Sequence, residues 1–240
     1  MTSNIPDLSA LILLVPDKAD PERDAVAAAW QVAGGRVLKL GRFWEPPELD
    51  QAHVRLYGND TFCLVLAEKL SLHLVSPPDR ILAKVPESLL RRRLRIVPLA
   101  TVRDGDFPVF AKPVVPKQFK SAVYDSAEAL AAETRGLERE VEVIVSEIVT
   151  FVAEARAFVL DGIVTACAIY EGSADCGEAT QFAARVAGAL DLPRTSVVDV
   201  GRLSDGTWAL IECNATWGAG LNGCDASSVI ACIAVASGAA

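Results

Sequence analysis

The chain has little histidine and no paired cysteine motif. Its 240 residues contain two histidines, His53 and His73, so a nucleophilic centre of the Ser-His-Asp or Cys-His kind has few bases to draw on. None of the six cysteines forms a Cys-x-x-Cys pair or has a histidine at ligand spacing, which disfavours a structural zinc site. We expect the cysteines to be buried, reduced thiols. Chemistry in this chain should therefore depend on carboxylates and lysines.

Long apolar runs and an excess of positive charge are also missing. The longest apolar runs, such as residues 8–15 and 229–236, are far shorter than the roughly 20 residues that cross a bilayer. No basic region precedes the first apolar stretch, which disfavours a signal peptide. The 31 acidic residues outnumber the 23 basic ones, and the net charge of -8 has the wrong sign for binding a phosphate backbone. We expect a cytoplasmic protein that binds neither nucleic acid nor membrane.

What the sequence does contain is enough apolar material for a substantial core. With 51% hydrophobic and 22% charged residues, the chain can form one compact unit or two lobes around a cleft. Its first half alternates strand and helix patterns, with strands predicted at residues 10–15 and 36–40 around a helix at residues 21–32. No G-x-G-x-x-G follows the first strand, so the usual dinucleotide-binding fold lacks its main support.

The pattern changes near residue 100. Beyond it, two strand pairs are predicted around the turns Asp161-Gly162 and Asp205-Gly206. Further helices are predicted at residues 86–93, 126–137, 178–190 and 224–237. The predicted fold class is therefore α+β. We divide the chain into an α/β N-terminal lobe at residues 1–100 and a second region at residues 101–240.

Three oxygen-bearing side chains gather at one end of the second strand pair. Glu212 and Asn214 are two residues apart on the outgoing strand, so they project from the same face. Asp199 lies close to Glu212 if residues 200–203 pair with residues 207–211. The neighbouring residues are apolar, and crowded carboxylates at the buried end of a strand pair need a counterion. We predict that the three residues hold magnesium. The alternative is a solvent-facing edge of an amphipathic hairpin.

Cations that could meet a magnesium-bound phosphate occur in the same region. Lys112 and Arg156 each interrupt an otherwise apolar strand, where a positive charge is costly unless an anion meets it. Lys117 and Lys120 follow in a loop bounded by proline. Taken singly, each cation could be a surface residue with a buried stem. Taken together with the predicted metal ligands, they indicate a phosphate site.

Nucleoside contacts are expected where the strand predicted at residues 141–147 ends. The segment that contains Glu147 and Val149 forms a bend, and its backbone C=O and N–H groups could pair with an adenine. Glu154 follows seven residues after Glu147 and could accept hydrogen bonds from ribose hydroxyls. This segment is therefore a candidate hinge for a nucleotide.

A glycine-rich loop follows the predicted metal ligands. Its glycines let backbone N–H groups approach an anion closely, and the loop enters a helix whose N-terminus favours negative charge. Four residues of the loop are therefore expected to face a carboxylate or acyl phosphate: Trp217, Gly218, Gly220 and Asn222. The alternative is a plain turn before a helix. Trp217 is either an apolar lid or a core residue, and Arg55 could contact an acidic substrate from the N-terminal lobe.

In their order along the chain, seven of these residues resemble the ATP-grasp superfamily: Lys112, Glu147, Glu154, Arg156, Asp199, Glu212 and Asn214. Members of that superfamily hold ATP between two α+β lobes and typically activate a carboxylate as an acyl phosphate for attack by an amine or thiol. The resemblance covers residues 107–225 and is strongest at Asp199 followed by Glu212-Cys213-Asn214. The Phe-x-Lys-Pro and Glu-x-Arg segments look similar to a compact bacterial and phage clade recognised by one arginine and two lysines.

The resemblance implies a role for each candidate. One set would contact ATP: Lys112, Lys117, Lys120, Glu147, Val149, Glu154 and Arg156. Of these, Lys112 and Arg156 would also act in catalysis, and either Lys117 or Lys120 would be the second phosphate lysine. Mg²⁺ would be held by Asp199, Glu212 and Asn214. Residues 114–124 contain no glycine, in contrast to the mobile loop of typical larger members.

The function that the resemblance implies is an ATP- and Mg²⁺-dependent carboxylate–amine ligase that works through an acyl phosphate. The substrates would be a small-molecule or peptide carboxylate and an amine. Two alternatives stay open, namely an ATP-dependent kinase or phosphotransferase of the same fold and a nucleotide-binding module without catalysis. The apolar C-terminal helix could cover the core or a second subunit, so a homodimer is a further expectation.

Overall fold

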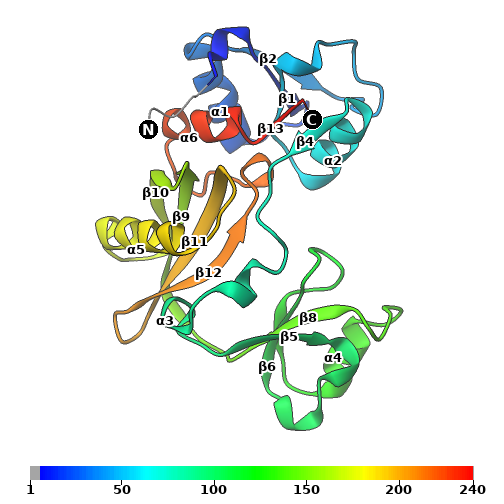
Figure 1. The fold of residues 1–240 in the computed structure, drawn as a ribbon, viewed down its shortest axis with the longest axis vertical. Helices are drawn as coiled ribbons and strands as arrows, with labels where there is room; N and C mark the ends of the chain where they lie inside the picture. Colours follow the sequence, from blue (N-terminus) through cyan, green and yellow to red (C-terminus); the bar gives the residue numbers. More distant parts are fainter. Residues whose placement is uncertain (1–5, 240) are drawn as a thin grey trace.

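The computed structural model describes residues 6–239 and has three parts along its long axis (Figure 1). A parallel sheet with its helices lies at one end, and an antiparallel sheet of four strands lies in the middle. A second antiparallel sheet, of four shorter strands, lies at the other end. The α+β prediction is confirmed. No helix among residues 6–239 is long and apolar enough to span a membrane.

The first part is a parallel sheet with the strand order β2-β1-β3. Its strands are β1 (Ile12–Pro16), β2 (Arg36–Leu40) and β3 (Val54–Leu56), and its helices are α1 (Pro21–Val32) and α2 (Asp60–Lys69). The central strand is buried throughout, as its continuous apolar run predicts. Asp20 caps the start of α1, because its side chain accepts a hydrogen bond from the backbone N–H of Arg23.

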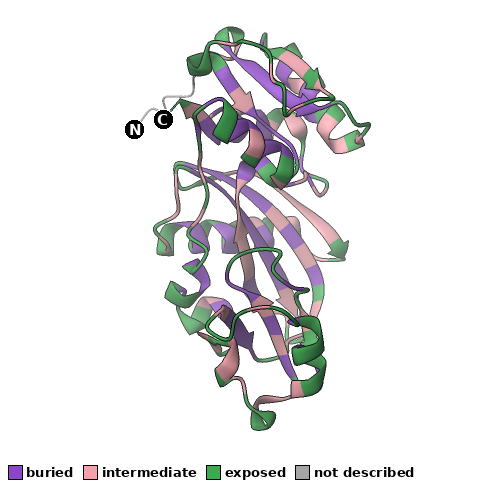
Figure 2. Cartoon of the chain, turned by 90° about the vertical axis from the view of Figure 1, so that its right-hand side faces the viewer, coloured by how far each residue is buried: buried purple, intermediate pink, exposed green. Residues whose placement is uncertain are grey.

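The middle part is an antiparallel sheet with the order β10-β9-β11-β12. Its strands are β9 (Phe151–Leu160), β10 (Ile163–Gly172), β11 (Thr195–Leu203) and β12 (Trp208–Asn214). The Asp-Gly turns connect them as predicted, with positive φ at Asp161, Gly162 and Gly206. One face packs on α5 (Cys176–Ala189), and the other packs on α6 (Ala226–Ala234) and the first part. Figure 2 shows buried residues concentrated along these strands.

The third part is an antiparallel sheet with the order β5-β8-β6-β7 and one helix. These elements are β5 (Leu94–Pro98), β6 (Val109–Pro113), β7 (Ala122–Tyr124), α4 (Ala127–Glu133) and β8 (Glu142–Ser146). Alternate residues such as Val109, Ala111 and Val143 pack with Leu130 of α4 in a small core. The intervening residues therefore face away from that core, towards the middle sheet.

Short elements complete the chain. They are α3 (Glu87–Leu90), the strands β4 (Leu72–Leu74) and β13 (Ser237–Ala239), and the 3-10 helices Leu8–Ala10, Gln51–His53, Ile81–Lys84, Leu99–Thr101, Asp104–Asp106 and Thr216–Gly218.

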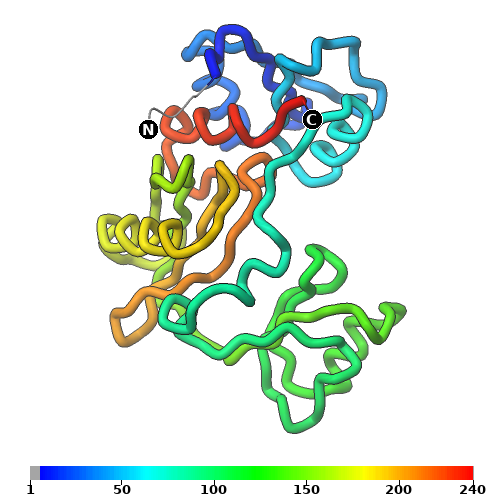
Figure 3. The backbone as a smooth tube through the Cα atoms, in the orientation of Figure 1, coloured from blue at the N-terminus to red at the C-terminus, as the bar shows by residue number. Residues whose placement is uncertain are grey.

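The sheets join residues from both sides of the division that we predicted at residue 100. β5 pairs with β8 in the third part, and β13 pairs with β4 next to the first part. The chain therefore returns at its C-terminal end to the N-terminal part, as the tube in Figure 3 shows. The division at residue 100 does not coincide with a boundary between sheets.

Three predicted helices are shorter than expected. α3 ends at Leu90 because Arg91 takes a left-handed conformation with φ of 54°. α4 ends at Glu133, where the hydroxyl of Thr134 donates to the Leu130 carbonyl. α6 ends at Ala234, since the chain from Ser237 onward forms a strand.

Candidate functional site

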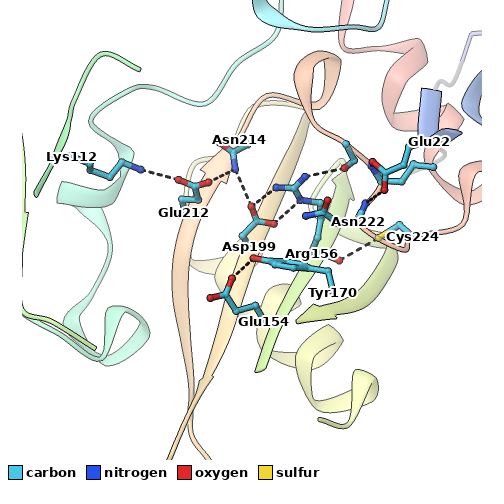
Figure 4. A network of polar contacts seen from close by, with 12 residues as sticks. Glu22, Lys112, Glu154, Arg156, Tyr170, Asp199, Glu212, Asn214, Asn222 and Cys224 are labelled. Atoms are coloured by element: carbon cyan, nitrogen blue, oxygen red, sulfur yellow. Dashed lines mark hydrogen bonds and ion pairs between the residues drawn. The ribbon is translucent and has the colours of Figure 1, made fainter. Parts of the chain in front are cut away.

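Polar side chains of the middle sheet gather on one face, opposite α5, and are drawn in Figure 4: Glu154, Arg156, Tyr170, Asp199, Glu212 and Asn214. The strand register explains the grouping. Asp199 lies directly across from Arg156 on β9 and from Glu212 on β12, and residues directly opposite in a sheet point to the same side. The predicted proximity of Asp199 to Glu212 is thus confirmed.

Arg156 and Asp199 form a buried, bidentate ion pair. Nε of Arg156 lies 2.8 Å from Oδ1 of Asp199, and Nη2 lies 2.7 Å from Oδ2. The side chain of Asp199 is 3% exposed and that of Arg156 is 12% exposed. Burial raises the pKa of Asp199 above its ordinary value, and the guanidinium offsets only part of that rise. The pair is therefore costly to separate unless another charge replaces the lost partner.

Glu212 lies between a lysine and an amide. Its Oε2 accepts from Nζ of Lys112 at 2.8 Å, and its Oε1 accepts from Nδ2 of Asn214 at 2.9 Å. Burial alone would raise the pKa of Glu212, but Lys112 and Asn214 outweigh that effect and hold it below its ordinary value. Asn214 also donates to Oδ2 of Asp199 at 3.0 Å. Carboxylate and amide groups are the oxygen donors that Mg²⁺ prefers, so these three residues fit that ion.

A cavity of about 270 Å³ lies beside this network, between the third part and the middle sheet. Its lining includes Lys112 and Glu212 at one side, the apolar residues Leu82, Leu94, Phe110, Ile144 and Ile211, and the bend Glu147-Ile148-Val149. Glu154 also lines it, and its Oε2 accepts from the Tyr170 hydroxyl at 2.5 Å. An apolar slot with charged groups at its edge suits a nucleoside with phosphates.

The carboxylate of Glu147 is hydrogen-bonded to Arg93. It accepts from the backbone N–H of Arg93 at 2.8 Å and from the Arg93 guanidinium, which together hold the pKa of Glu147 below its ordinary value. Its own backbone N–H donates to the Arg93 carbonyl at 3.1 Å. The bend lies at the cavity, while the Glu147 side chain ties the end of β8 to the residue that precedes β5.

The two further lysines are not gathered with the other candidates. Nζ of Lys117 lies 2.6 Å from Oδ2 of Asp60 at the start of α2, and the lysine side chain is 69% exposed. Lys120 is exposed, and its backbone N–H donates to Glu133. Neither lysine lines the cavity. The structure therefore does not select one of them as the second phosphate lysine.

The glycine-rich loop is held by residues of the first part. The carboxylate of Glu22 on α1 accepts from the backbone N–H groups of Leu221 and Asn222 at 3.0 and 2.8 Å. The Gly220 carbonyl accepts from Nη1 of Arg156 at 3.0 Å, which connects the loop to the ion pair. The loop thus does meet an anion, and in this structure the anion is the chain's own glutamate.

Trp217 and Arg55 do not face the site. Trp217 is buried in the core around β1 and β3, and its Nε1 donates to the hydroxyl of Ser76, so its role as a lid is wrong and the core alternative holds. The guanidinium of Arg55 donates to the backbone carbonyls of Ala52, Val54 and Ala234. These bonds tie β3 to the end of α6. Gly218 lies near Asp60 rather than near the Arg156 ion pair.

Sequence reasoning missed Arg92 and Glu22. Arg92 lines the cavity with a buried side chain, although its neighbours Arg91, Arg93 and Arg95 make the segment look like a charged surface. Glu22 belongs to an ordinary acidic first turn of a helix. Both act through contacts with residues far along the chain, for which no local pattern exists.

Solved structures of other proteins share this fold. Similar solved structures include a RimK domain ATP-grasp protein from Sphaerobacter thermophilus DSM 20745, with 17% identity and a TM-score of 0.59 over 93% of this chain and 99% of that chain. D-cycloserine synthetase DcsG matches with 17% identity and a TM-score of 0.58 over 93% and 98% of the two chains. D-alanine–D-alanine ligase from Bacillus anthracis, complexed with ATP, matches with 15% identity and a TM-score of 0.50 over 88% and 86%.

A search of curated proteins found no match. The model of an ATP-grasp domain family, family 2 of the clade named for one arginine and two lysines, matches residues 89–232, which is more than half of the chain. This range includes the cavity lining from Arg92 onward, the ion pair, and the residues Asp199, Glu212 and Asn214. The chain therefore belongs to family 2 of the one-arginine, two-lysine clade of ATP-grasp proteins.

Proposed function

We propose that this ATP-grasp protein is a carboxylate–amine ligase that forms an amide or peptide bond through an acyl phosphate. One observation carries the proposal: three side chains that can donate oxygen ligands, Glu212, Asn214 and Asp199, lie in a row between the cations Lys112 and Arg156. Lys112 and Glu212 also line the apolar cavity. Such a row can neutralise a polyphosphate and then a newly phosphorylated carboxylate.

ATP and Mg²⁺ are the cofactors of this fold, and the residues present offer cations for the phosphates and oxygen atoms for the metal. The cavity would take the adenine and ribose, and both the bend at Val149 and Glu154 belong to its lining. Lys112 would exchange its contact with Glu212 for one with the phosphates. Asp199, Glu212 and Asn214 would hold Mg²⁺, which supplies positive charge to the phosphate oxygens.

The chemistry proceeds in two transfers. A carboxylate oxygen of the substrate attacks the γ-phosphorus of ATP, the bond between that phosphorus and the bridging oxygen breaks, and ADP leaves. The amine nitrogen then attacks the acyl carbon, the bond from that carbon to the phosphate oxygen breaks, and the phosphate leaves with the proton that the nitrogen loses. Lys112 and Arg156 stabilise the charge that moves in these steps, so no nucleophilic side chain is needed.

Proteins of similar fold support the class of substrate. D-alanine–D-alanine ligase joins two amino acids, as its name states, and PsnB is described as an ATP-grasp ligase complexed with a minimal precursor. Its structure matches with a TM-score of 0.50. We therefore propose that the acceptor is a small-molecule or peptide carboxylate and that the second substrate is an amine.

The test is Mg²⁺-dependent ADP release with a panel of carboxylates and amines, followed by mass spectrometry of the product. An amide together with ADP and phosphate is expected, whereas a phosphorylated hydroxyl would identify a kinase. Lys112→Met and Glu212→Gln should lose at least about 100-fold in turnover. Lys69→Met changes a lysine of α2 outside the site and should keep the wild-type rate. Wild-type turnover in both site variants would refute the assignment.

A further inference from the structure

Strand β12 carries one residue more than the strand it pairs with. Asp199 pairs with Glu212, but the next residue, Val200, pairs with Leu210, so Ile211 has no partner on β11. This arrangement is a β-bulge, in which two residues of one strand oppose one residue of the other. The extra residue shifts the alternation of side chains from that point onward.

The bulge decides which way the oxygen ligands point. Leu210 is fully buried and Cys213 is partly buried in the core next to α5. In a regular strand Glu212 would share the face of Leu210, and its carboxylate would enter that apolar core. With the bulge, Glu212 and Asn214 lie on the opposite face and form their hydrogen bonds with Lys112 and Asp199.

Arg92 satisfies the backbone carbonyls at the bulge. Its Nη1 donates to the Leu210 carbonyl at 2.7 Å, and its Nη2 donates to the Ile211 carbonyl at 3.2 Å. Nη1 also donates to the Leu90 carbonyl at 2.9 Å, which ties the guanidinium to the end of α3. Arg92 is 9% exposed and stands 118 residues before Leu210 in the sequence. Buried carbonyls without such a donor would be costly.

We propose that Arg92 is a positioning residue for the magnesium ligands: it holds the bulge at Leu210 and Ile211 and thereby fixes the direction of Glu212 and Asn214. This inference rests on the proposed function, because it takes those two residues as ligands of Mg²⁺. The hydrogen bonds of the Arg92 guanidinium go to backbone carbonyls and not to the side chains of Glu212 or Asn214, so Arg92 acts through the backbone of β12. The planar fork of arginine suits two adjacent carbonyls better than the single ammonium of lysine does.

The experiment measures binding of a non-hydrolysable ATP analogue by calorimetry, with Mg²⁺ titrated from zero to saturation. Arg92→Met is compared with the wild type at saturating analogue, because Arg92 lines the cavity and its loss also changes the surface that meets the nucleotide. Its half-saturating Mg²⁺ concentration should rise by about tenfold or more, because partners that orient metal ligands change metal affinity by that amount. Arg92→Lys should fall between the wild type and Arg92→Met.

A matched control and a second readout make the outcomes distinct. Arg95→Met removes an arginine that pairs with Asp106 and should leave the Mg²⁺ dependence unchanged. If Arg92→Met fails to fold, Arg92→Lys carries the test, with near-ultraviolet circular dichroism as the check of native packing. A wild type that binds the analogue equally with and without Mg²⁺ would overturn the proposed function together with this inference. A wild type that needs Mg²⁺, with unchanged Mg²⁺ dependence in the Arg92 variants, would overturn the inference alone.

Discussion

The carboxylate of Glu22 lies 2.8 Å from the backbone nitrogen of Asn222, although 200 residues separate the two in the sequence. The same carboxylate also accepts from the backbone N–H of Leu221. Since Gly220 in this loop accepts from Arg156, Glu22 connects α1 to the ion pair on the middle sheet through a few bonds. The first part of the chain is therefore coupled to the site by a charged, half-buried contact.

We expect Glu22→Gln to destabilise the chain. The neutral amide offers one acceptor oxygen in place of two, and its NH₂ group would face a backbone donor. Hydrogen bonds to a charged group contribute about 1.5–3 kcal/mol, which corresponds to a fall of roughly 3–12 °C in Tm for a chain of this size. Differential scanning calorimetry measures the change. Glu48→Gln, an identical change at an exposed position of the first part, should leave Tm unaltered, and equal Tm values for both variants would contradict the coupling.

Gly220→Ala should disturb the same contact by steric means. A Cβ atom at Gly220 would lie 2.6 Å from Oε2 of Glu22, so the carboxylate or the loop must move. We expect loss of about 1–3 kcal/mol in the free energy of unfolding, measured by urea denaturation. Gly188→Ala is the matched control, because nothing lies within 4 Å of its added Cβ and the residue is inside α5. That variant should gain about 0.5–1 kcal/mol. Stabilisation by both changes would show that the loop has free space.

Local patterns predicted much of the fold and part of the site. The alternation along β11 and β12 and the Asp-Gly turn between them led to the prediction that Asp199 lies close to Glu212, and the strand register confirms it. The ATP-grasp membership expected from the ordered residues is confirmed. The bulge at Ile211 has no such local signal, because a regular strand and a bulged strand have the same apolar composition. The sequence therefore predicted which residues gather at the site, but not the β-bulge that sets the direction of their side chains.

Contacts between distant segments account for what was not predicted. Arg92 lies in a run of arginines that resembles a solvated surface, yet its hydrogen bonds reach β12. The residues next to Trp217 in the sequence do not show whether it covers a substrate or fills a core. Its burial depends on the position of β1 and β3, against which it packs. Lys117 meets Asp60, a pairing that depends on how the third part sits against the first. The positions of these side chains are therefore set by tertiary packing.

Three cysteines, Cys167, Cys213 and Cys224, should react slowly in the native chain. Burial raises the pKa of Cys213 and of Cys224 to about 12 and that of Cys167 to about 11. A raised thiol pKa keeps the group protonated, so at pH 8 roughly one Cys167 side chain in a thousand is a thiolate. Alkylation with iodoacetamide followed by peptide mass spectrometry should find these three sites largely unmodified. In urea all six cysteines should react, and rapid modification of native Cys213 would contradict the raised pKa of its thiol.

Arg156→Met should destabilise the chain most strongly of the single changes considered. It leaves the carboxylate of Asp199 buried without its ion-pair partner, which costs about 3–5 kcal/mol in other proteins. Removing the guanidinium should raise the pKa of Asp199 further, since burial already raises it. A carboxyl group whose pKa is higher in the folded state favours folding at low pH and loses that contribution as pH rises. The destabilisation should therefore be smaller at pH 4 than at pH 7.5.

The double variant Arg156→Met/Asp199→Asn separates charge from packing. With a neutral amide at position 199, no uncompensated buried charge remains, and Asn214 can still hydrogen-bond to the new side chain. Urea unfolding at both pH values should show the double variant to be more stable than Arg156→Met at pH 7.5 and nearly independent of pH in this range. If the single and double variants lose the same free energy at pH 7.5, the cost comes from lost packing around Arg156. The ion pair with Asp199 would then contribute little to the stability of the folded chain.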